Sequence, residues 1–348
     1  MDRPHYMTSD VLIIHNSVEN GSAAKDKIVF EESCAGLMEE VRVVTETLKS
    51  LGVKYKVKSI ETIEQLPEVL TSCKEKIVFN LVEEFPADIM QACYVPAICQ
   101  AYGRACTGNS TAALILAQNK GQTKAVLKDA GVPVPDGTTV QINQKINLKG
   151  LTHGKYFVKP VFSDASEGIS VNSIVDLPSE ALNKAIDKIH NQFNQPALVE
   201  QFIPDGELNI SLIQQGDNVR VLPIAEIDFG AFSADEPKIV DYSAKWHAGS
   251  FAFNNTPRII PAPLSEEVAS LVRQYALAAW NAIGCQDYAR VDFRMSRREH
   301  VFVLEVNPNP DISEDAGFAA ALEAGGISYK KFVETILNNA SMRNSENL

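Results

Sequence analysis

The sequence predicts an α/β domain with a parallel, doubly wound sheet, followed by a region of α+β architecture. The chain has 348 residues, which is more than one hydrophobic core usually serves, so two or three domains are expected. Strand patterns alternate with helix patterns up to about residue 115, which is typical of a parallel sheet. Beyond that point, strands follow one another with fewer helices between them, which favours antiparallel pairing.

The first part of the chain contains three expected strands. Residues 10–15, DVLIIH, have the continuous apolar character of a buried strand, and VKYKVKSI (53–60) and EKIVFNLV (75–82) are two further strands with a helical segment between them. Residues 32–51 are expected to form an amphipathic helix that Gly52 ends. Its apolar residues at helical spacing are Leu37, Val41, Val44 and Leu48. A helix over about 111–130 then leads into GVPVPDG, whose prolines and glycines indicate a boundary.

The second part is expected to consist mainly of strands, with helices at about 178–194, 264–284 and 328–340. The expected strands are KYFVKPV (155–161), QPALVEQFI (195–203), LNISLIQQ (208–215), VRVLPIAEI (219–227), YARVDFRM (288–295) and HVFVLEVN (300–307).

Composition and charge narrow the class of partner. Hydrophobic residues make up 45% of the chain and charged residues 22%, as in an ordinary globular protein. The net charge of −12 argues against nucleic acid or an anionic membrane as a partner, but not against a nucleotide in a local basic pocket. The six cysteines form no C-x-x-C pair, and neither a signal peptide nor a membrane span is evident. We therefore expect a cytoplasmic protein with reduced thiols.

Two strands near the C-terminus carry polar residues on one face. In YARVDFRMSRREHVFVLEVNPN (288–309), Arg290 and Asp292 are two residues apart and so share a face, as do Glu305 and Asn307. A turn centred between Arg298 and Glu299 places Asp292 opposite Glu305, and Arg290 opposite Asn307. The other face then holds Val291, Phe293, Leu304 and Val306.

Two carboxylates that face each other across strands repel unless a positive charge lies between them. Mg²⁺ is a natural candidate, because it takes oxygen ligands from carboxylates and from substrate phosphates. Asn307 adds a neutral oxygen ligand, and Arg290 can stabilise negative charge that develops beside the metal. The alternative is a solvated hairpin face on which Arg290 only neutralises its neighbours, and the hairpin alone does not decide between the two.

Several segments have features of a nucleotide site, each weak by itself. Lys159 ends a strand and is followed by a small-residue loop up to Gly168, through which backbone N–H groups can approach phosphates. Lys120 lies near the start of a helix, where it could also reach phosphate. The alternative for both lysines is an ordinary surface position. No GxxxxGK[ST] or GxGxxG motif is present, so the usual nucleotide-binding folds are not indicated.

The segment ALVEQFIPDGELNI (197–210) can likewise be interpreted either as part of a nucleotide site or as ordinary surface. Glu207, just after a Pro-Asp-Gly turn, could accept hydrogen bonds from ribose hydroxyls, as could Glu200 at the end of a strand. The backbone from Gln201 to Ile203 could read an adenine edge. Either glutamate could equally be an ordinary surface charge.

The order of these pieces resembles the ATP-grasp superfamily. A Lys-Pro strand and glycine loop come first, then VEQFIPDGELN, ARVDF and LEVNPNP. Within the superfamily the chain is similar to D-alanine–D-alanine ligase-like proteins over nearly its whole length, including CTGNSTAALILAQNK (106–120). The motifs are specific from about residue 106 onward, and the part before that resembles the family in layout.

The resemblance implies a three-domain ATP-grasp architecture and a carboxylate–amine ligase. The implied parts are an N-terminal parallel-sheet domain (1–115), a small central subdomain (116–205) and a C-terminal subdomain (206–348) with a lid at about 235–257. ATP would phosphorylate a carboxylate to an acyl phosphate, which an amine then attacks. Small-molecule carboxylate and amine substrates, ATP, two Mg²⁺ ions (or Mn²⁺) and a possible homodimer are implied with it.

The resemblance also implies a role for each site residue. Arg290 would stabilise the tetrahedral intermediate, and Lys245 of the lid would reach the γ-phosphate. Lys120, Lys159 and Ser166 would bind phosphates, Glu207 would bind ribose, and Glu200, Gln201 and Ile203 would bind adenine. The metal ligands would be Asp292, Glu305 and Asn307.

The amino-acid pockets depart from the family pattern. Trp246 stands where D-alanine-joining ligases have a tyrosine, and Ala165 stands at the position of the loop serine that bonds to it. The oxyanion glycine and the carboxylate-binding serine align with Asp311 and Ala316. Two further family positions have uncertain counterparts in this chain. The histidine in the first domain of the ligases aligns with Glu83, and their N-terminal glutamate aligns with Glu31 or Glu32.

These departures favour a relative that acts on other amino acids or on a small molecule derived from them. A true D-alanine–D-alanine ligase, a ligase that modifies peptides or proteins, and a non-catalytic ATP-binding regulatory module of the same fold stay open. The joint presence of Arg290, Asp292, Glu305 and Asn307 speaks against the last, because a protein that only binds ATP does not need Arg290.

Overall fold

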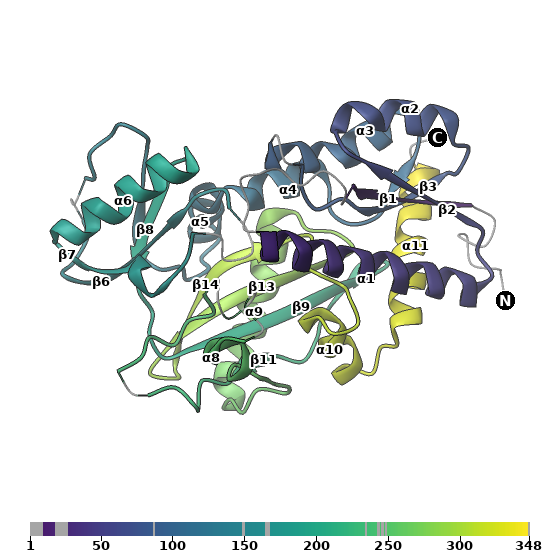
Figure 1. Ribbon diagram of the computed structural model, residues 1–348. Helices are drawn as coiled ribbons and strands as arrows, with labels where there is room; N and C mark the ends of the chain where they lie inside the picture. Colours follow the sequence, from purple (N-terminus) through teal and green to yellow (C-terminus); the bar gives the residue numbers. More distant parts are fainter. Residues whose placement is uncertain are drawn as a thin grey trace.

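The computed structural model describes residues 10–17, 27–85, 88–147, 150–163, 168–233, 235–241, 244, 247 and 249–346, with the backbone alone at 27–33 and 344–346. The strands form one parallel sheet and two antiparallel sheets, which confirms the predicted fold class (Figure 1). The strands of the three sheets fall in turn within residues 11–106, 137–201 and 206–307. The domain boundaries expected from the sequence stay a prediction.

The first sheet has the strand order β2-β1-β3-β4, and its pairs are all parallel. Its strands are β1 (Val11–Asn16), β2 (Tyr55–Ile60), β3 (Ile77–Leu81) and β4 (Ala105–Cys106). Alternate side chains of β1 enter opposite cores, with Val11 and Ile13 on the α1 side and Leu12 and Ile14 on the α2 and α3 side (Figure 1). The covering helices are α1 (Lys27–Leu51), η2 (Ile63–Gln65), α2 (Leu66–Ser72), η3 (Ile89–Tyr94) and α3 (Val95–Ala101).

The end of the chain returns to this first sheet. Helix α11 (Tyr329–Glu346) packs on the α1 side and buries Phe332 and Ile336 in the same core, after the short helix α10 (Gly317–Ala324). Asp287, which is fully buried just before β13, accepts hydrogen bonds from Arg343 of α11 at 2.8 Å and from the Gly108 N–H at 2.8 Å. This network fixes three distant parts of the chain beside the start of the polar hairpin.

The second sheet is antiparallel, with the order β5-β8-β6-β7. Its strands are β5 (Gly137–Val140), β6 (Gly154–Pro160), β7 (Ile174–Leu177) and β8 (Ala197–Gln201), with η4 (Val171–Ser173) before β7. Helix α6 (Glu180–Phe193) covers it through Leu182, Ile186 and Ile189. Strand β5 was not predicted, and it begins at Gly137, the last residue of the expected turn-rich boundary.

The single helix expected over 111–130 is two helices, α4 (Thr111–Gln118) and α5 (Lys120–Asp129). Asn119 separates them with an extended backbone (φ −93°, ψ 92°). Its side chain accepts a hydrogen bond from the Gln122 N–H and so caps α5, which is a preferred use of asparagine. Lys120 is consequently the first residue of a new helix, not an interior position.

The third sheet has the order β12-β11-β9-β13-β14, and β10 pairs with β9. Its strands are β9 (Gly206–Gln215), β10 (Asn218–Val221), β11 (Ala225–Ile227), β12 (Arg258–Ile259), β13 (Tyr288–Ser296) and β14 (His300–Asn307), and α8 (Phe251–Asn254) precedes β12. Helix α9 (Glu266–Ile283) packs through Val272, Ala276 and Trp280 against the apolar face of β13. The prediction of one strand over 219–227 was wrong, because residues 222–224 separate β10 from β11 and Pro223 has no N–H to donate to a ladder.

The polar hairpin has the predicted register at its functional end. Arg290 pairs with Asn307, and Asp292 pairs with Glu305. The register then shifts by one residue, so that Phe293 pairs with Val303 and Leu304 is bulged out of the ladder. The expectation that Leu304 lies on the apolar face was wrong, because Val303 is the β14 side chain buried beside Phe293.

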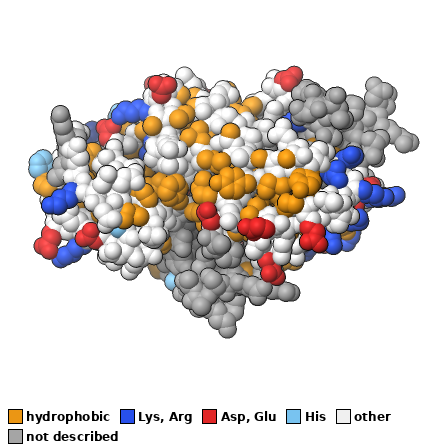
Figure 2. Space-filling view, turned by 90° about the horizontal axis from the view of Figure 1, so that it is seen from above, with side chains coloured by type: hydrophobic (Ala, Val, Ile, Leu, Met, Phe, Trp, Pro, Cys, Tyr) orange, Lys and Arg blue, Asp and Glu red, His pale blue; other side chains and the backbone are white. Residues whose placement is uncertain are grey.

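No helix among the described residues is long and apolar enough to cross a membrane. Hydrophobic side chains gather in a band across the middle of the face seen from above in Figure 2, the side on which Figure 1 places α2 and α3. Large exposed apolar patches are typical of protein–protein contacts. The homodimer that the resemblance implies stays a prediction.

Candidate functional site

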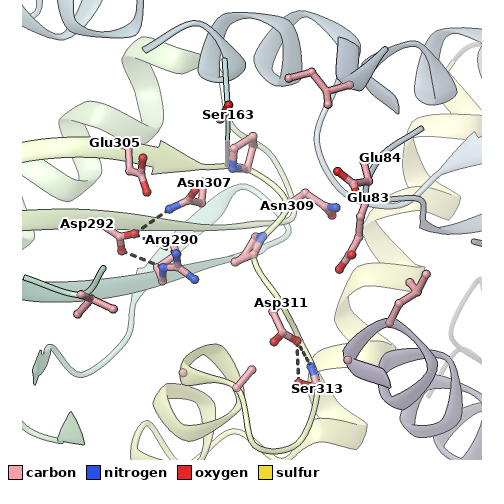
Figure 3. Close-up of a pocket in the computed structure, with 18 of the residues that line it drawn as sticks. Glu83, Glu84, Ser163, Arg290, Asp292, Glu305, Asn307, Asn309, Asp311 and Ser313 are labelled. Atoms are coloured by element: carbon pink, nitrogen blue, oxygen red, sulfur yellow. Dashed lines mark hydrogen bonds and ion pairs between the residues drawn. The ribbon is translucent and has the colours of Figure 1, made fainter. Parts of the chain in front are cut away.

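A cavity of about 1390 Å³ is lined by residues from the ends of β1 and β3, from the segment after β6, and from the polar face of the third sheet. The carboxyl end of a parallel sheet is a common place for a ligand site, because the strands stop there together. Figure 3 shows Glu83 and Glu84 on one side of this cavity and the hairpin residues on the other. Further lining residues include Asn16, Asn80, Ser163, Gly168, Glu207, Asn209, Arg258, Asn309, Asp311 and Ser313.

Asp292 is the centre of the polar cluster on the hairpin (Figure 3). Its Oδ1 accepts hydrogen bonds from Arg290 Nε and Asn209 Nδ2, both at 2.8 Å. Its Oδ2 accepts from Arg290 Nη2 at 2.9 Å and from Asn307 Nδ2 at 2.8 Å. Burial alone would lower the pKa of Arg290, but the charge and hydrogen bonds of Asp292 raise it, so the arginine stays charged. The same ion pair is also expected if the hairpin face is only solvated and Arg290 only neutralises its neighbours.

The oxygen groups on this face fit a hard divalent cation. Glu305 lines the cavity from the strand position opposite Asp292, and Asn209 and Asn307 each carry an amide oxygen beside it. An amide that donates through nitrogen here presents its oxygen after a half-turn of the group. Carboxylate and amide oxygens are ligands that Mg²⁺ takes. No cluster of three or more His, Cys, Asp or Glu residues within the described ranges could hold a metal, so a cation on this face would depend on two carboxylates and on amide oxygens.

Lys159 and Lys124 form a buried three-residue ion cluster with Glu200. Lys159 Nζ lies 2.7 Å from Glu200 Oε1, and Lys124 Nζ lies 2.7 Å from Glu200 Oε2. The side chains of Lys159, Lys124 and Glu200 are 5%, 9% and 2% exposed. Burial alone would raise the pKa of Glu200, but the charges and hydrogen bonds of the two lysines outweigh it and hold that pKa below its ordinary value.

Lys124 was not predicted from the sequence. It lies four residues after Lys120, a spacing that places both lysines on one face of a helix and could have indicated it. Its Nζ also donates to the Leu304 carbonyl oxygen at 3.0 Å, at the bulge next to Glu305. Lys120 itself is buried and donates to the Ser163 carbonyl oxygen. The structure thus brings Lys120 to the segment that begins the predicted phosphate loop, whereas the Lys159 ammonium faces Glu200.

The predicted adenine and ribose residues lie within residues 200–207, the β8–β9 segment, which runs from the end of β8 through the connection into the start of β9. Glu207 lines the cavity, and Arg294 Nη1 lies 3.5 Å from its Oε2. The Gln201 N–H donates to the Asp136 carbonyl oxygen, whereas the Ile203 N–H makes no hydrogen bond within the part of the chain that the structure describes. The Glu200 carboxylate faces the two lysines, so an adenine contact at this position falls to the backbone.

Some predicted positions lie outside the described residues. These are Ala165 and Ser166 of the phosphate loop and Lys245 and Trp246 of the expected lid. The side chains of Glu31 and Glu32 are likewise not described.

The far end of the cavity, beyond the hairpin, carries several carboxylates. Asp311 Oδ1 accepts hydrogen bonds from the Ser313 N–H at 2.8 Å and from the Ser313 hydroxyl at 2.7 Å (Figure 3). Glu40 is 4% exposed and accepts a hydrogen bond from the Ile312 N–H at 2.7 Å. Its burial, together with the nearby charges of Glu83 and Asp311, raises the pKa of Glu40 well above the ordinary value. Of the described positions that depart from the expected family pattern, Glu83, Asp311 and Ala316 line this cavity, and Glu83 and Asp311 both lie near Glu40.

Comparison with known families gives a match over most of the chain. The family model described as "D-ala D-ala ligase C-terminus" matches residues 126–338. This range runs from the last turn of α5 into α11, and so includes the hairpin, Lys159 and the β8–β9 segment, whereas Lys120 and Lys124 precede it.

Individual relatives agree with this match. The chain is 32% identical to an uncharacterized protein y4sG of Sinorhizobium fredii over 272 residues, covering 77% of this chain and 75% of that protein. It is 31% identical to a D-alanine–D-alanine ligase of Carboxydothermus hydrogenoformans over 235 residues, covering 66% of this chain and 71% of that one. Among solved structures, a D-alanine–D-alanine ligase from Bacillus anthracis complexed with ATP has a similar fold, with a TM-score of 0.75, 18% identity and coverage of 98% of this chain and 100% of that chain.

Proposed function

Since the chain belongs to the D-alanine–D-alanine ligase family and is an ATP-grasp ligase, we propose that it uses ATP to join a carboxylate to an amine. The substrates proposed are amino acids or small molecules derived from them. The observation that carries the proposal is the grouping of Arg290, Asp292, Glu305 and Asn307 on one face of a sheet that lines the cavity of about 1390 Å³.

The proposed reaction has two steps. A carboxylate oxygen of the first substrate attacks the γ-phosphorus of ATP, an O–P bond forms, and ADP leaves. The amine nitrogen of the second substrate then attacks the acyl carbon, the bond from that carbon to the phosphate oxygen breaks, and the nitrogen loses a proton. Arg290, with its side chain 21% exposed, lies where its guanidinium can stabilise the oxyanion of the tetrahedral intermediate.

Asp292, Glu305 and Asn307 are the residues that we propose hold two Mg²⁺ ions, for which Mn²⁺ could substitute. Bound there, the ions would neutralise phosphate charge. The donors around Asp292 already orient its carboxylate, so these oxygens are fixed before any cation arrives.

We propose that the nucleotide lies between the buried lysines and the β8–β9 segment. Lys120, Lys159 and Ser166 are assigned to the phosphates, and Glu207 is assigned to the ribose. The Ile203 N–H, which makes no hydrogen bond among the described residues, is assigned to the adenine edge together with Gln201. Glu200 supports this site by holding Lys159 rather than by touching the base, and Lys245 is assigned to the γ-phosphate.

The substrate pair is the finer part of the proposal. Asp311 and Ala316 occupy the positions where the resemblance expects an oxyanion glycine and a serine for the second substrate's carboxylate. The charges of Glu83 and Asp311 lie close together at this end of the cavity and disfavour a substrate carboxylate there, which favours a different amine from D-alanine. Joining of two D-alanines is the second candidate, and the names of the relatives favour it.

Phosphate release should appear when the enzyme receives ATP, Mg²⁺ and its own substrate pair, because acyl phosphate formation requires the carboxylate. A panel of D- and L-amino acids offered singly and in pairs, with product masses, would test this. Release with D-alanine and the mass of its dipeptide would establish the second candidate. Release only with another pair would name the substrates, and silence across the panel despite measured ATP binding would favour the regulatory-module alternative.

ATP with Mg²⁺ should protect residues 235–257 from proteolysis, because we propose that this segment forms a lid over the nucleotide. The measurement is the rate of cleavage within the segment with and without ATP, compared with cleavage in the 216–218 turn as an internal control. Equal cleavage rates in both conditions would remove the lid from the proposal.

A further inference from the structure

Arg294 is the third side chain on the cavity-side face of β13, after Arg290 and Asp292, and it was not singled out from the sequence. It pairs with Glu207 of β9 in the sheet register. It is only 4% exposed, and it lies beneath the cavity rather than among its lining residues. A buried arginine requires partners for its charge and its N–H groups.

The guanidinium of Arg294 joins two segments that are far apart in the sequence. Its Nε and Nη2 donate to the Ile203 carbonyl oxygen at 2.9 and 2.7 Å, and its Nη1 donates to the Lys238 carbonyl oxygen at 2.6 Å. Ile203 belongs to the β8–β9 segment, and Lys238 belongs to the described part of the expected lid.

Two further contacts complete the surroundings of this side chain. The guanidinium carbon lies 5.7 Å from the centre of the Phe202 ring, and Nη1 lies 3.5 Å from Glu207 Oε2. Every group that Arg294 contacts here therefore belongs to the β8–β9 segment or to the segment that follows β11. The planar fork of an arginine can bond to both carbonyls at once, which the single ammonium of a lysine does less well.

We propose that Arg294 is a positioning residue that holds the β8–β9 segment in its nucleotide-binding shape and anchors the first part of the lid to it. This inference rests on the proposed function, since it assigns ATP to Ile203 and Glu207. Arg294 touches no reacting atom. It acts on ATP affinity through the two carbonyls and Glu207, and it fixes residues 235–241 even before nucleotide binds.

The test uses Arg294→Met, which keeps length but removes charge and donors, and Arg294→Lys, which keeps the charge. We expect the ATP dissociation constant, measured by titration calorimetry with Mg²⁺, to rise at least about 10-fold in Arg294→Met and by less in Arg294→Lys. At saturating ATP, kcat should change by no more than about 3-fold. Hydrogen exchange of residues 235–241 in the nucleotide-free protein should become faster in both variants.

The matched control is Arg298→Met at the hairpin turn. Arg298 also makes a two-bond ion pair, with Glu226 at 2.8 and 3.1 Å, and its other described hydrogen bond goes to the Pro263 carbonyl oxygen rather than to the β8–β9 segment or residues 235–241. We expect its ATP affinity and its exchange rates to match those of the wild type. A lower melting temperature of Arg294→Met with unchanged ATP affinity and unchanged exchange would show a merely structural role and overturn the inference.

Failure of the proposed function would look different. In that case the wild-type protein itself would not bind ATP. The anchoring half of the inference would then be decided by hydrogen exchange at residues 235–241 without nucleotide, where equal rates in wild type and Arg294→Lys would overturn it. Arg294→Lys also serves if Arg294→Met does not fold, because it retains the buried charge beside Glu207.

Discussion

Replacing Arg290 with alanine should slow amide formation by about 10²- to 10³-fold, close to the loss that follows removal of one oxyanion donor. The variant should still fold, because Asp292 keeps the hydrogen bonds from Asn209 and Asn307. ATP affinity should change far less than turnover, since Arg290 is assigned to the intermediate and not to the nucleotide. The measurements are product formation by mass, phosphate release and ATP binding.

Arg290→Lys is the matched control for charge. It retains a cation beside Asp292 but cannot reproduce the planar pair made by Nε and Nη2, so we expect turnover between those of wild type and the alanine variant. Normal product formation in Arg290→Ala would remove Arg290 from the mechanism. It would also favour the view that this arginine only neutralises Asp292.

Replacing Glu200 with glutamine should destabilise the protein by about 3–5 kcal/mol, the range seen when one partner of a buried ion pair is removed. Two ammonium groups, Lys124 and Lys159, would then remain buried without a counter-charge. Lys124→Met should lower the free energy of unfolding by less than Glu200→Gln does. It leaves Lys159 and Glu200 as a pair with no net charge, and it mainly removes the donor to the Leu304 carbonyl. Urea unfolding of each variant measures the difference.

The double variant Glu200→Gln with Lys124→Met tests the same cluster. It leaves one lysine without its counter-charge instead of two, so it should recover part of the stability lost in Glu200→Gln. Equal losses in the two single variants, with no recovery in the double variant, would contradict the electrostatic account. Ionised Glu200 stabilises the folded protein fully above the ordinary carboxyl pKa of about 4.3. This stabilisation disappears as the pH falls through the lowered pKa of Glu200 in the folded state. The Glu200→Gln variant should therefore lack this loss of stability in acid.

The hairpin shows which structural features the alternation of residues along a strand can predict. Strand side chains alternate between faces, so the two-residue spacing of Arg290 with Asp292 and of Glu305 with Asn307 was enough to predict their shared face and their pairing. The same reasoning failed at Leu304, because a bulge interrupts the alternation there. The Leu304 carbonyl is held by Lys124, a residue of a distant helix, and no pattern within the hairpin indicates that contact.

Short or interrupted elements were the ones that the sequence did not predict. Strands β4 and β12 have two residues each, and β5 begins with a glycine in a segment that reads as a turn. Such segments are too short to show a period, and their place in a sheet depends on the neighbouring strands. Asn119 likewise divides a stretch whose composition suits one continuous helix.

The sequence by itself determined the fold class, the long helices and strands, the shared face of the four hairpin residues and the membership of an ATP-grasp family. These features depend on periodicity and on short motifs, which the order of residues contains directly. Only the tertiary structure decided that Glu200 faces Lys124 and Lys159, and that Arg294 joins Ile203 to Lys238. Both arrangements bring together groups from separate elements, and the pairing of a buried charge depends on which elements pack around it, not on its neighbours along the chain.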